Sequence, residues 1–349
     1  MTTAPYETTS VQGQLTISER IRPDEAELFR SLLLDSLPTH YDEVDASFPD
    51  SIVDTATAGT DRHGYFTRTK RLFVGRVDGR TQAFTVASYK RGGAVKMGPT
   101  VVLPELRRTG LGTAFRRLVE DRILDDQHIR KLYLTVTSGN TRTLLFNLGL
   151  GYQVEGVLAG QYRKGSSELV LGKVVRGGRL SDLPYGRRLA PAPAGGVEVS
   201  ETPPGAQELE AYLTPRMREG FAGIDGTFVH SILDALSEDR QTYACKGKRL
   251  LVARQPDGAL CGAAVLVPKR GGAAKISPLV ADHQGALLEL VEHAVHAARQ
   301  MGRHRLYAIV PELERDTVER LTAHGFHLEA QLREAYKAGV DSFVLGRTL

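Results

Sequence analysis

The stretch KMGPTVVLPELRRTGLG, residues 96–112, decides the fold of the first half of this 349-residue chain. Its apolar run ends at Pro104, and Arg107, Gly110 and Gly112 follow in the spacing R-x-x-G-x-G. The next residues, TAFRRLVEDRIL, have the periodicity of an amphipathic helix. A strand, a glycine turn and a helix in this order present unpaired backbone N–H groups to an anion, at the positive end of the helix dipole. The stretch therefore predicts an anion-binding turn, although the motif is weak by itself.

The segments around this stretch predict a mixed α/β sheet. Strands are expected from residue 15, over 70–79 and 81–90 with an Asp78-Gly79 turn, over 131–136, around Tyr162 and over 169–175. Helices are expected over 23–37, 50–59 and 109–125, with a short one ending near Gly149. The order is β-α-α-β-β-β-α-β-α-β-β, typical of an α/β fold with a mixed sheet.

The second half of the chain repeats the first. PKRGGAAKISPLV (268–280) matches YKRGGAVKMGPTV (89–101), KRLLV (248–252) matches KRLFV (70–74), and RLYAIV (305–310) matches KLYLTV (131–136). Between the copies lies a Gly/Pro/Ala-rich segment with the composition of a linker. We therefore expect a flexible tail over 1–14, a first domain over 15–176, a linker over 177–196 and a second copy over 197–349.

The two copies differ at the glycine turn. Thirty-one residues separate Val101 from Tyr133, but only twenty-six separate Val280 from Tyr307, and the shorter segment has no R-x-x-G-x-G. A closed-up turn cannot offer the same row of N–H groups. The second copy is therefore expected to keep the scaffold and to lack the anion site.

The composition narrows the class of protein. The chain is 41% hydrophobic and 25% charged with a formal charge of +4, and its basic residues form no run interleaved with aromatic ones, which disfavours nucleic acid as a partner. No apolar stretch is long enough for a transmembrane helix, and the first residues do not resemble an export signal. Cys245 and Cys261 offer neither a disulfide framework nor metal-ligand spacing. A cytoplasmic protein without a membrane partner or a metal is expected, as a monomer or homodimer.

A later asparagine makes the first copy more specific. Asn140 follows the strand KLYLTV, and Leu-Gly-Tyr follows the next short helix. The pattern V-x-P-x-x-R-x-x-G-x-G, then Asn, then L-G-Y resembles the GNAT superfamily of N-acyltransferases. The resemblance covers residues 15–175 through these motifs and 197–349 through the repeat. It implies a two-lobed GNAT fold with a degenerate second copy. It also implies that the protein uses acetyl-CoA as co-substrate.

The resemblance also implies where the acyl-CoA binds. Amides of the glycine turn would hold the pyrophosphate, the edge of the preceding strand would pair with the pantetheine arm, and the asparagine side chain would bind that arm. The residues assigned to the acyl-CoA in this way are Val101, Val102, Leu103, Arg107, Arg108, Thr109, Gly110, Leu111, Gly112, Thr113 and Asn140. Plain turn glycines, solvated arginines and a helix-capping asparagine are the structural alternatives.

The acceptor side and the proton-transfer groups are less defined. The loop after the first helix contains His40, Tyr41, Asp42, Glu43 and Asp45, which could bind a cationic amine, with Glu43 as the candidate base. His63 and Tyr65 are second candidates for acceptor binding. The alternative for the loop is a solvated segment with a helix cap.

One family feature is absent from the first copy. Several members place a tyrosine acid seven residues after the asparagine, but here that residue is Asn147. Tyr152 and Tyr133 are nearby substitutes, each more often a core residue.

The leading functional hypothesis is direct transfer of an acetyl group from acetyl-CoA to a small-molecule amine in a ternary complex. Alternatives are a non-catalytic acyl-CoA-binding or regulatory protein, and an acyltransferase that uses another acyl-CoA or a carrier-bound donor. A protein or peptide acceptor is a third class, which is disfavoured because a second lobe packed on the first would narrow the acceptor cleft.

Overall fold

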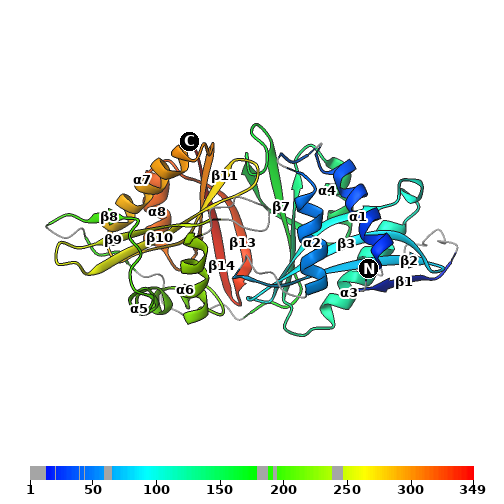
Figure 1. Ribbon diagram of the computed structural model, residues 1–349, viewed down its shortest axis with the longest axis horizontal. Helices are drawn as coiled ribbons and strands as arrows, with labels where there is room; N and C mark the ends of the chain where they lie inside the picture. The colour runs from blue at the N-terminus through cyan, green and yellow to red at the C-terminus, as the bar shows by residue number, and fades with distance from the viewer. Residues whose placement is uncertain are drawn as a thin grey trace, which may run out of the picture.

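A single mixed sheet with helices on both faces makes up the protein. The computed structural model describes residues 13–19, 21–38, 40–42, 44–58, 65–178, 188–191, 195–237 and 247–349. Figure 1 shows the two halves of the chain as lobes that lie side by side along the longest axis. The expected flexible tail, apart from residues 13 and 14, and the linker segments 179–187 and 192–194 lie outside the described residues.

The first lobe has the element order that the sequence predicts. Its elements are β1 (Leu15–Ser18), α1 (Pro23–Ser36), α2 (Ser47–Ala58), β2 (Thr67–Val77), β3 (Arg80–Lys90), β4 (Ala94–Val102), the 3-10 turn η1 (Pro104–Leu106), α3 (Leu111–Leu124), β5 (Lys131–Thr137), α4 (Thr141–Gly149), β6 (Gln153–Ala159) and β7 (Ser167–Val174). The strand expected around Tyr162 is wrong. β6 ends at Ala159, and Tyr162 lies in the connection to β7, where Gly160 and Gly165 adopt positive φ angles.

The second lobe repeats this order. Its elements are β8 (Glu198–Ser200), α5 (Ala206–Met217), α6 (Gly226–Leu233), η2 (Asp234–Ser237), β9 (Arg249–Arg254), β10 (Leu260–Pro268), β11 (Ala273–Ala281), α7 (Gln284–Gln300), β12 (Arg305–Pro311), α8 (Arg315–Ala323), β13 (His327–Lys337) and β14 (Val340–Thr348). The mixed α/β fold class and the duplicated architecture are both as expected from the sequence.

The two half-sheets join into one sheet with a near-symmetric strand order. That order is β1-β2-β3-β4-β5-β7-β6-β13-β14-β12-β11-β10-β9-β8, so the second lobe reads as the first in reverse. β6 and β13 pair antiparallel where Gly156 lies opposite Ala330. These residues hold equivalent places, each five positions after the Gly151 and Gly325 that mark the repeat. A Cβ at Gly156 would lie 2.3 Å from the Cβ of Ala330, so glycine permits this close contact.

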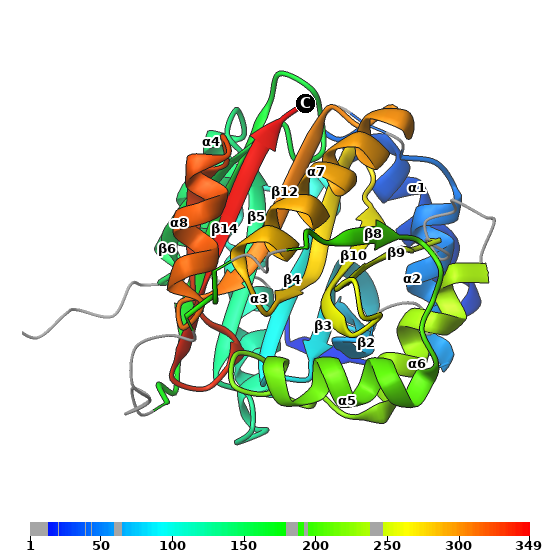
Figure 2. The same ribbon diagram turned by 90° about the vertical axis from the view of Figure 1, so that its left-hand side faces the viewer.

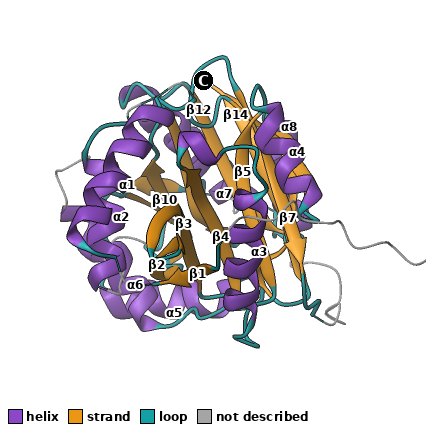
Figure 3. Ribbon diagram, turned by 90° about the vertical axis from the view of Figure 1, so that its right-hand side faces the viewer, coloured by secondary structure: helices purple, strands orange, loops and turns teal. Residues whose placement is uncertain are grey.

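Helices cover both faces of each half-sheet. In the first lobe, Phe29 and Ile52 of α1 and α2 pack on one face, and Phe115 and Val119 of α3 pack on the other (Figure 3). In the second lobe, α7 and α8 cover one face and α5 and α6 the other (Figure 2). None of the helices in the described ranges is long and apolar enough to cross a bilayer.

The repeated KRGG segments are hairpin turns, each of which packs against the opposite lobe. A Cβ at Gly92 would lie 2.3 Å from the backbone oxygen of Tyr336, and one at Gly271 would lie 2.0 Å from that of Tyr162. Each lobe therefore inserts its glycine hairpin against the same backbone position of the other lobe. The requirement for close backbone approach accounts for the strongest sequence match between the copies.

Candidate functional site

The two strands expected to hold the acyl-CoA separate after a short paired segment. β4 and β5 run parallel in register at Ala94–Lys131, Val95–Leu132 and Lys96–Tyr133. Beyond these pairs β4 continues along β3 to Val102, and β5 continues along β7 to Thr137. Within the described ranges, the edge of β4 after Lys96 thus has no strand partner on the β5 side. An unpaired edge of this kind can accept an extended amide-bearing ligand.

The glycine turn lies where β4 ends and α3 begins. Gly110 caps the helix with φ 87°, and Arg108 also has a positive φ of 71°. Among the described residues no protein acceptor binds the backbone N–H groups of residues 108–112. Arg108 and Thr109 are exposed beside them. A row of free amides, a helix N-terminus and an arginine provide what a pyrophosphate requires.

The other residues assigned to this strand and turn have structural contacts as well. Val101 is buried in the core under α1 and α2, and the amide of Leu103 donates to the carbonyl of Gln82. The guanidinium of Arg107 donates 3.2 Å to the carbonyl of Val102, which holds the turn against the strand. Leu111 is buried at the start of α3, whereas Gly112 and Thr113 are partly exposed.

Asn140 lies at the carboxyl end of β5 and caps α4. Its side-chain oxygen accepts the amide of Thr143 at 3.1 Å, and its Nδ2 lies 3.5 Å from Nε2 of His40. The capping role named as an alternative is therefore present. The contact also brings the loop after α1 to the end of β5, so the donor and acceptor segments predicted from the sequence meet there.

The loop after α1 divides into residues that face the site and residues that do not. Tyr41 packs edge-on against Tyr162, with ring centroids 5.4 Å apart. Asp45 is exposed and caps α2 by accepting the amide of Ser47 at 2.9 Å. Glu43, the candidate base, lies outside the described residues, as does His63.

Tyr65 lies at the interface between the lobes. Its hydroxyl donates to the backbone of Gly223 and lies 3.0 Å from Oδ1 of Asp225, and its ring packs on Phe228 of α6. Arg91 lies 4.1 Å above the same ring. These contacts connect Tyr65 to the second lobe.

A buried carboxylate to which no sequence motif points lies beside Tyr41 and Tyr162. Glu168 on β7 pairs in register with Thr137, whose hydroxyl donates to its Oε1 at 2.7 Å. The side chain is 2% exposed, and its Oε2 has no hydrogen-bond partner among the described residues. Burial raises the pKa of Glu168 to about 7, although the Thr137 hydrogen bond and the charge of Lys96 oppose the shift. The one available signal was an acidic residue on an apolar strand where the second copy has Ser342.

Lys96 and Tyr162 form a pair next to Glu168. The Lys96 ammonium lies 3.3 Å from the Tyr162 hydroxyl. Burial alone would raise the pKa of Tyr162, but the charge of Lys96 and hydrogen bonds with Lys96 and Thr135 bring it below the usual value for tyrosine. Burial, and next the charge of Glu168, raise the pKa of Tyr41 to about 12. The site therefore combines a carboxylate that titrates near neutrality with an acidified phenol.

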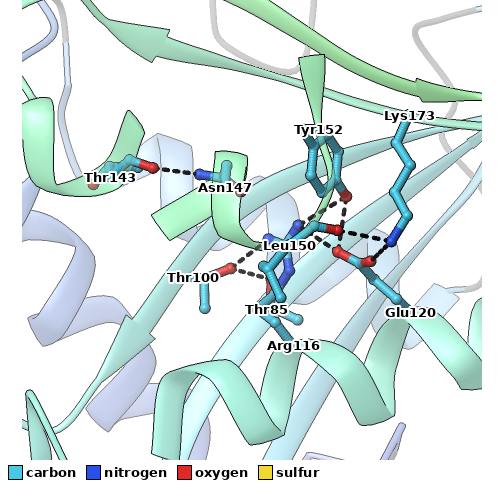
Figure 4. Close-up of polar contacts among 9 residues, drawn as sticks. All are labelled: Thr85, Thr100, Arg116, Glu120, Thr143, Asn147, Leu150, Tyr152 and Lys173. Carbon is cyan, nitrogen blue, oxygen red and sulfur yellow. Dashed lines mark hydrogen bonds and ion pairs between the residues drawn. The ribbon is translucent and has the colours of Figure 1, made fainter. Parts of the chain in front are cut away.

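Tyr152 and Tyr133 are the nearby tyrosines that the sequence offers as substitutes for the missing family acid. Figure 4 shows the Tyr152 hydroxyl within a buried network, 3.1 Å from Arg116 and 2.9 Å from Glu120, which is 3.0 Å from Lys173. Burial raises the pKa of Tyr152 and that of Tyr133 above the usual range. Asn147 is buried and donates from Nδ2 to the carbonyl of Thr143 at 2.8 Å (Figure 4). None of these groups is a ready proton donor.

The corresponding place in the second lobe has a different construction. β11 and β12 separate after four parallel pairs, much as β4 and β5 do after three. The pairing of β3 with β4 contains a β-bulge, and an equivalent bulge is present between β10 and β11. At the start of α7, however, His283 caps the helix by accepting the amide of Ala286, and the amide of Gln284 donates to the carbonyl of Ala190 in the linker. Ala190 forms an isolated parallel bridge with His283. The linker thus covers the helix end that is open in the first lobe.

Comparison with known proteins gives matches among solved structures. A search of family models gives no match, and neither does a search of curated protein sequences. Among solved structures, a GNAT-family acetyltransferase from Desulfovibrio desulfuricans is 18% identical over 46% of this chain and 99% of its own, with a TM-score of 0.39. The ribosomal-protein-S18-alanine N-acetyltransferase from Escherichia coli is 14% identical over 49% of this chain and 99% of its own, with a TM-score of 0.35. NAA60 from Arabidopsis thaliana in complex with acetyl-CoA is 16% identical over 46% and 99%, with a TM-score of 0.37. Each of these matches covers about half of this chain and nearly all of the matched structure.

Proposed function

We propose that this chain is an N-acetyltransferase that moves an acetyl group from acetyl-CoA to the amine of a small molecule. The observation that carries the proposal is the separation of β4 from β5, which ends in a turn of free amides and lies beside the buried carboxylate of Glu168. An anion site, an unpaired strand edge and a base are the parts that transfer from a thioester requires.

The donor fits the first lobe. The free amides of residues 108–112 and the exposed Arg107 and Arg108 suit the pyrophosphate of coenzyme A. The edge of β4 beyond Lys96 offers backbone groups to the pantetheine amides, and one N–H there can stabilise the oxyanion formed at the thioester carbonyl. The capping bond of Asn140 uses only its side-chain oxygen, so its Nδ2, which faces Nε2 of His40, can also donate to the pantetheine arm.

The proton transfers are assigned to Glu168 and Tyr162. Glu168 takes a proton from the bound ammonium, and the freed amine attacks the thioester carbonyl while both substrates are bound. As the C–N bond forms and the C–S bond breaks, the thiolate takes a proton from the Tyr162 hydroxyl, and the second proton of the attacking nitrogen returns to the phenolate as the amide forms. The adjacent Lys96 ammonium stabilises the resulting phenolate. His40 and Tyr41 line the acceptor side.

In this proposal the protein has one active site, which lies in the first lobe. Coverage of the α7 N-terminus by the linker and the replacement of Glu168 by Ser342 remove both the anion site and the base from that lobe. The lobe instead contributes Arg270, which lies 5.9 Å above the ring of Tyr41 and 4.5 Å above that of Phe48. It therefore shapes the acceptor side of the first lobe.

Acetyl-CoA-dependent thiol release with a panel of small amines tests the proposal. Release should require both the acceptor and the glycine turn, so Gly110→Asp should abolish it. Gly258→Asp is the control, because Gly258 has φ 86° against 87° at Gly110 and both lie in open space. Tight binding of coenzyme A without turnover of any amine, including a peptide N-terminus, would instead support a non-catalytic binding protein. Turnover only with longer acyl-CoA or a carrier-bound donor would revise the donor.

A further inference from the structure

Each lobe carries a lysine and two tyrosines in equivalent places. The lysine lies on the first of the two separating strands and pairs in register with a tyrosine on the second. The other tyrosine lies just after β6 in the first lobe and near the end of β13 in the second. The lysine ammonium lies 5.9 Å from the ring of the latter tyrosine in the first lobe and 5.7 Å in the second. The sets are Lys96, Tyr133 and Tyr162, and Lys275, Tyr307 and Tyr336.

The two sets differ in their charge partners. Lys96 faces the Tyr162 hydroxyl and the carboxylate of Glu168. At the place of Glu168 the second lobe has Ser342, which is fully buried and whose hydroxyl has no partner among the described residues. Over the same residues, no hydrogen-bond acceptor or carboxylate contacts Lys275. Burial and the nearby charge of Lys248 lower the pKa of Lys275 to about 8.

The two sets meet across the seam between the lobes. The hydroxyl of Tyr336 is an electrostatic neighbour of Tyr133 and Lys96, and that of Tyr307 is a neighbour of Tyr162. The ring of Tyr336 in turn neighbours Lys275. Phenols therefore connect the surroundings of Glu168 with those of Lys275.

We infer that Lys275 binds an anionic group of the acceptor, a carboxylate or a phosphate, while the acceptor amine lies at Glu168. A partly buried ammonium that has no counter-ion among the described residues is unfavourable, and an anionic ligand would supply the missing charge. The assignment of the amine rests on the proposed function, but the anion site at Lys275 does not.

The arrangement also defines the shape of the acceptor. Glu168 neighbours Lys96, Lys96 neighbours Tyr336, and the ring of Tyr336 neighbours Lys275, so in this proposal the amine and the anion are several bonds apart. The acceptor class is therefore an amine with a remote acidic group, such as an ω-amino acid or a short peptide, rather than a simple alkylamine.

Calorimetric titration of the full chain, saturated with coenzyme A, tests this inference. The probes are ω-amino carboxylates from glycine to 6-aminohexanoate, each compared with the uncharged amide of the same length. We expect the longer acids to bind at least about tenfold more tightly than their amides, as one charge-assisted contact predicts. Lys275→Met should bring the ratio to about one, and the exposed Lys164→Met should leave it unchanged.

The outcomes separate the two proposals. A ratio near one at every length, a ratio that persists in Lys275→Met, or the absence of binding by all probes would overturn the anion site. Lys275→Gln, which keeps a polar group there, guards against misfolding of the methionine variant. Failure of the wild-type chain to release thiol with any amine would contradict the proposed function and leave the binding ratio intact.

Discussion

Removal of the Glu168 charge by Glu168→Gln should stabilise the protein at alkaline pH. Burial raises the pKa of this carboxyl from 4.5 to about 7, because only Oε1 has a hydrogen-bond donor. The folded chain therefore binds more protons than the unfolded chain between these values, and the free energy of unfolding falls as pH rises through them. The shift corresponds to about 3 kcal/mol. The variant should exceed the wild type by up to this amount above about pH 8, and the difference should vanish below about pH 4.

Urea unfolding of both proteins without ligand, at several pH values, measures the effect. Glu155→Gln is the control, because Glu155 is also a buried glutamate but binds Lys131 at 2.7 Å. Loss of that partner should destabilise the protein at neutral and alkaline pH by about 3–5 kcal/mol. If Glu168→Gln destabilises equally at acid and alkaline pH, the carboxylate is not held in a desolvated state, and the argument for its role as base fails.

Three other changes probe the donor site, the seam and the acid. Arg108→Glu should weaken coenzyme A binding about tenfold or more and reduce its salt dependence, as measured by calorimetry, because it reverses a charge beside the free amides. Gly92→Ala should lower the melting temperature markedly, because its Cβ would lie 2.3 Å from the Tyr336 oxygen, whereas Gly139→Ala has open space and should be near neutral. Tyr162→Phe should lower kcat by about 100-fold or more with little change in KM. A change in KM as large as the change in kcat would contradict the role of Tyr162 as acid.

The sequence predicts the scaffold well because its signals are local. The periodic apolar residues, the glycine hairpins and the repeat give the element order of both lobes. The details that fail have local causes as well. The helix expected from Thr109 begins at Leu111, since Gly110 adopts a left-handed conformation. The strand expected around Tyr162 is displaced by the glycine-rich connection after Ala159.

The candidate site is less accessible to sequence reasoning because its chemistry depends on burial. Asn140 and His40 are found by motif and loop composition, and the structure brings them together. Glu168 belongs to no motif, and its pKa depends on a strand pairing and a desolvation that no spacing reveals. Although burial opposes it, the pKa of Tyr162 is lowered mainly because Lys96, 66 positions away, lies beside its hydroxyl.

The asymmetry between the lobes explains why a duplicated fold would have one site. The second lobe keeps the strand separation, the bulge and the Lys275–Tyr307 pair, so the backbone conditions for a groove survive. What it lacks are side chains and amides: Ser342 replaces the carboxylate, and Ala190 occupies the helix end. An equivalent lysine left without its carboxylate would normally be a burden to stability. Its presence at the seam, connected by phenols to the intact site, is reasonable if the second lobe has exchanged a donor site for recognition of the acceptor.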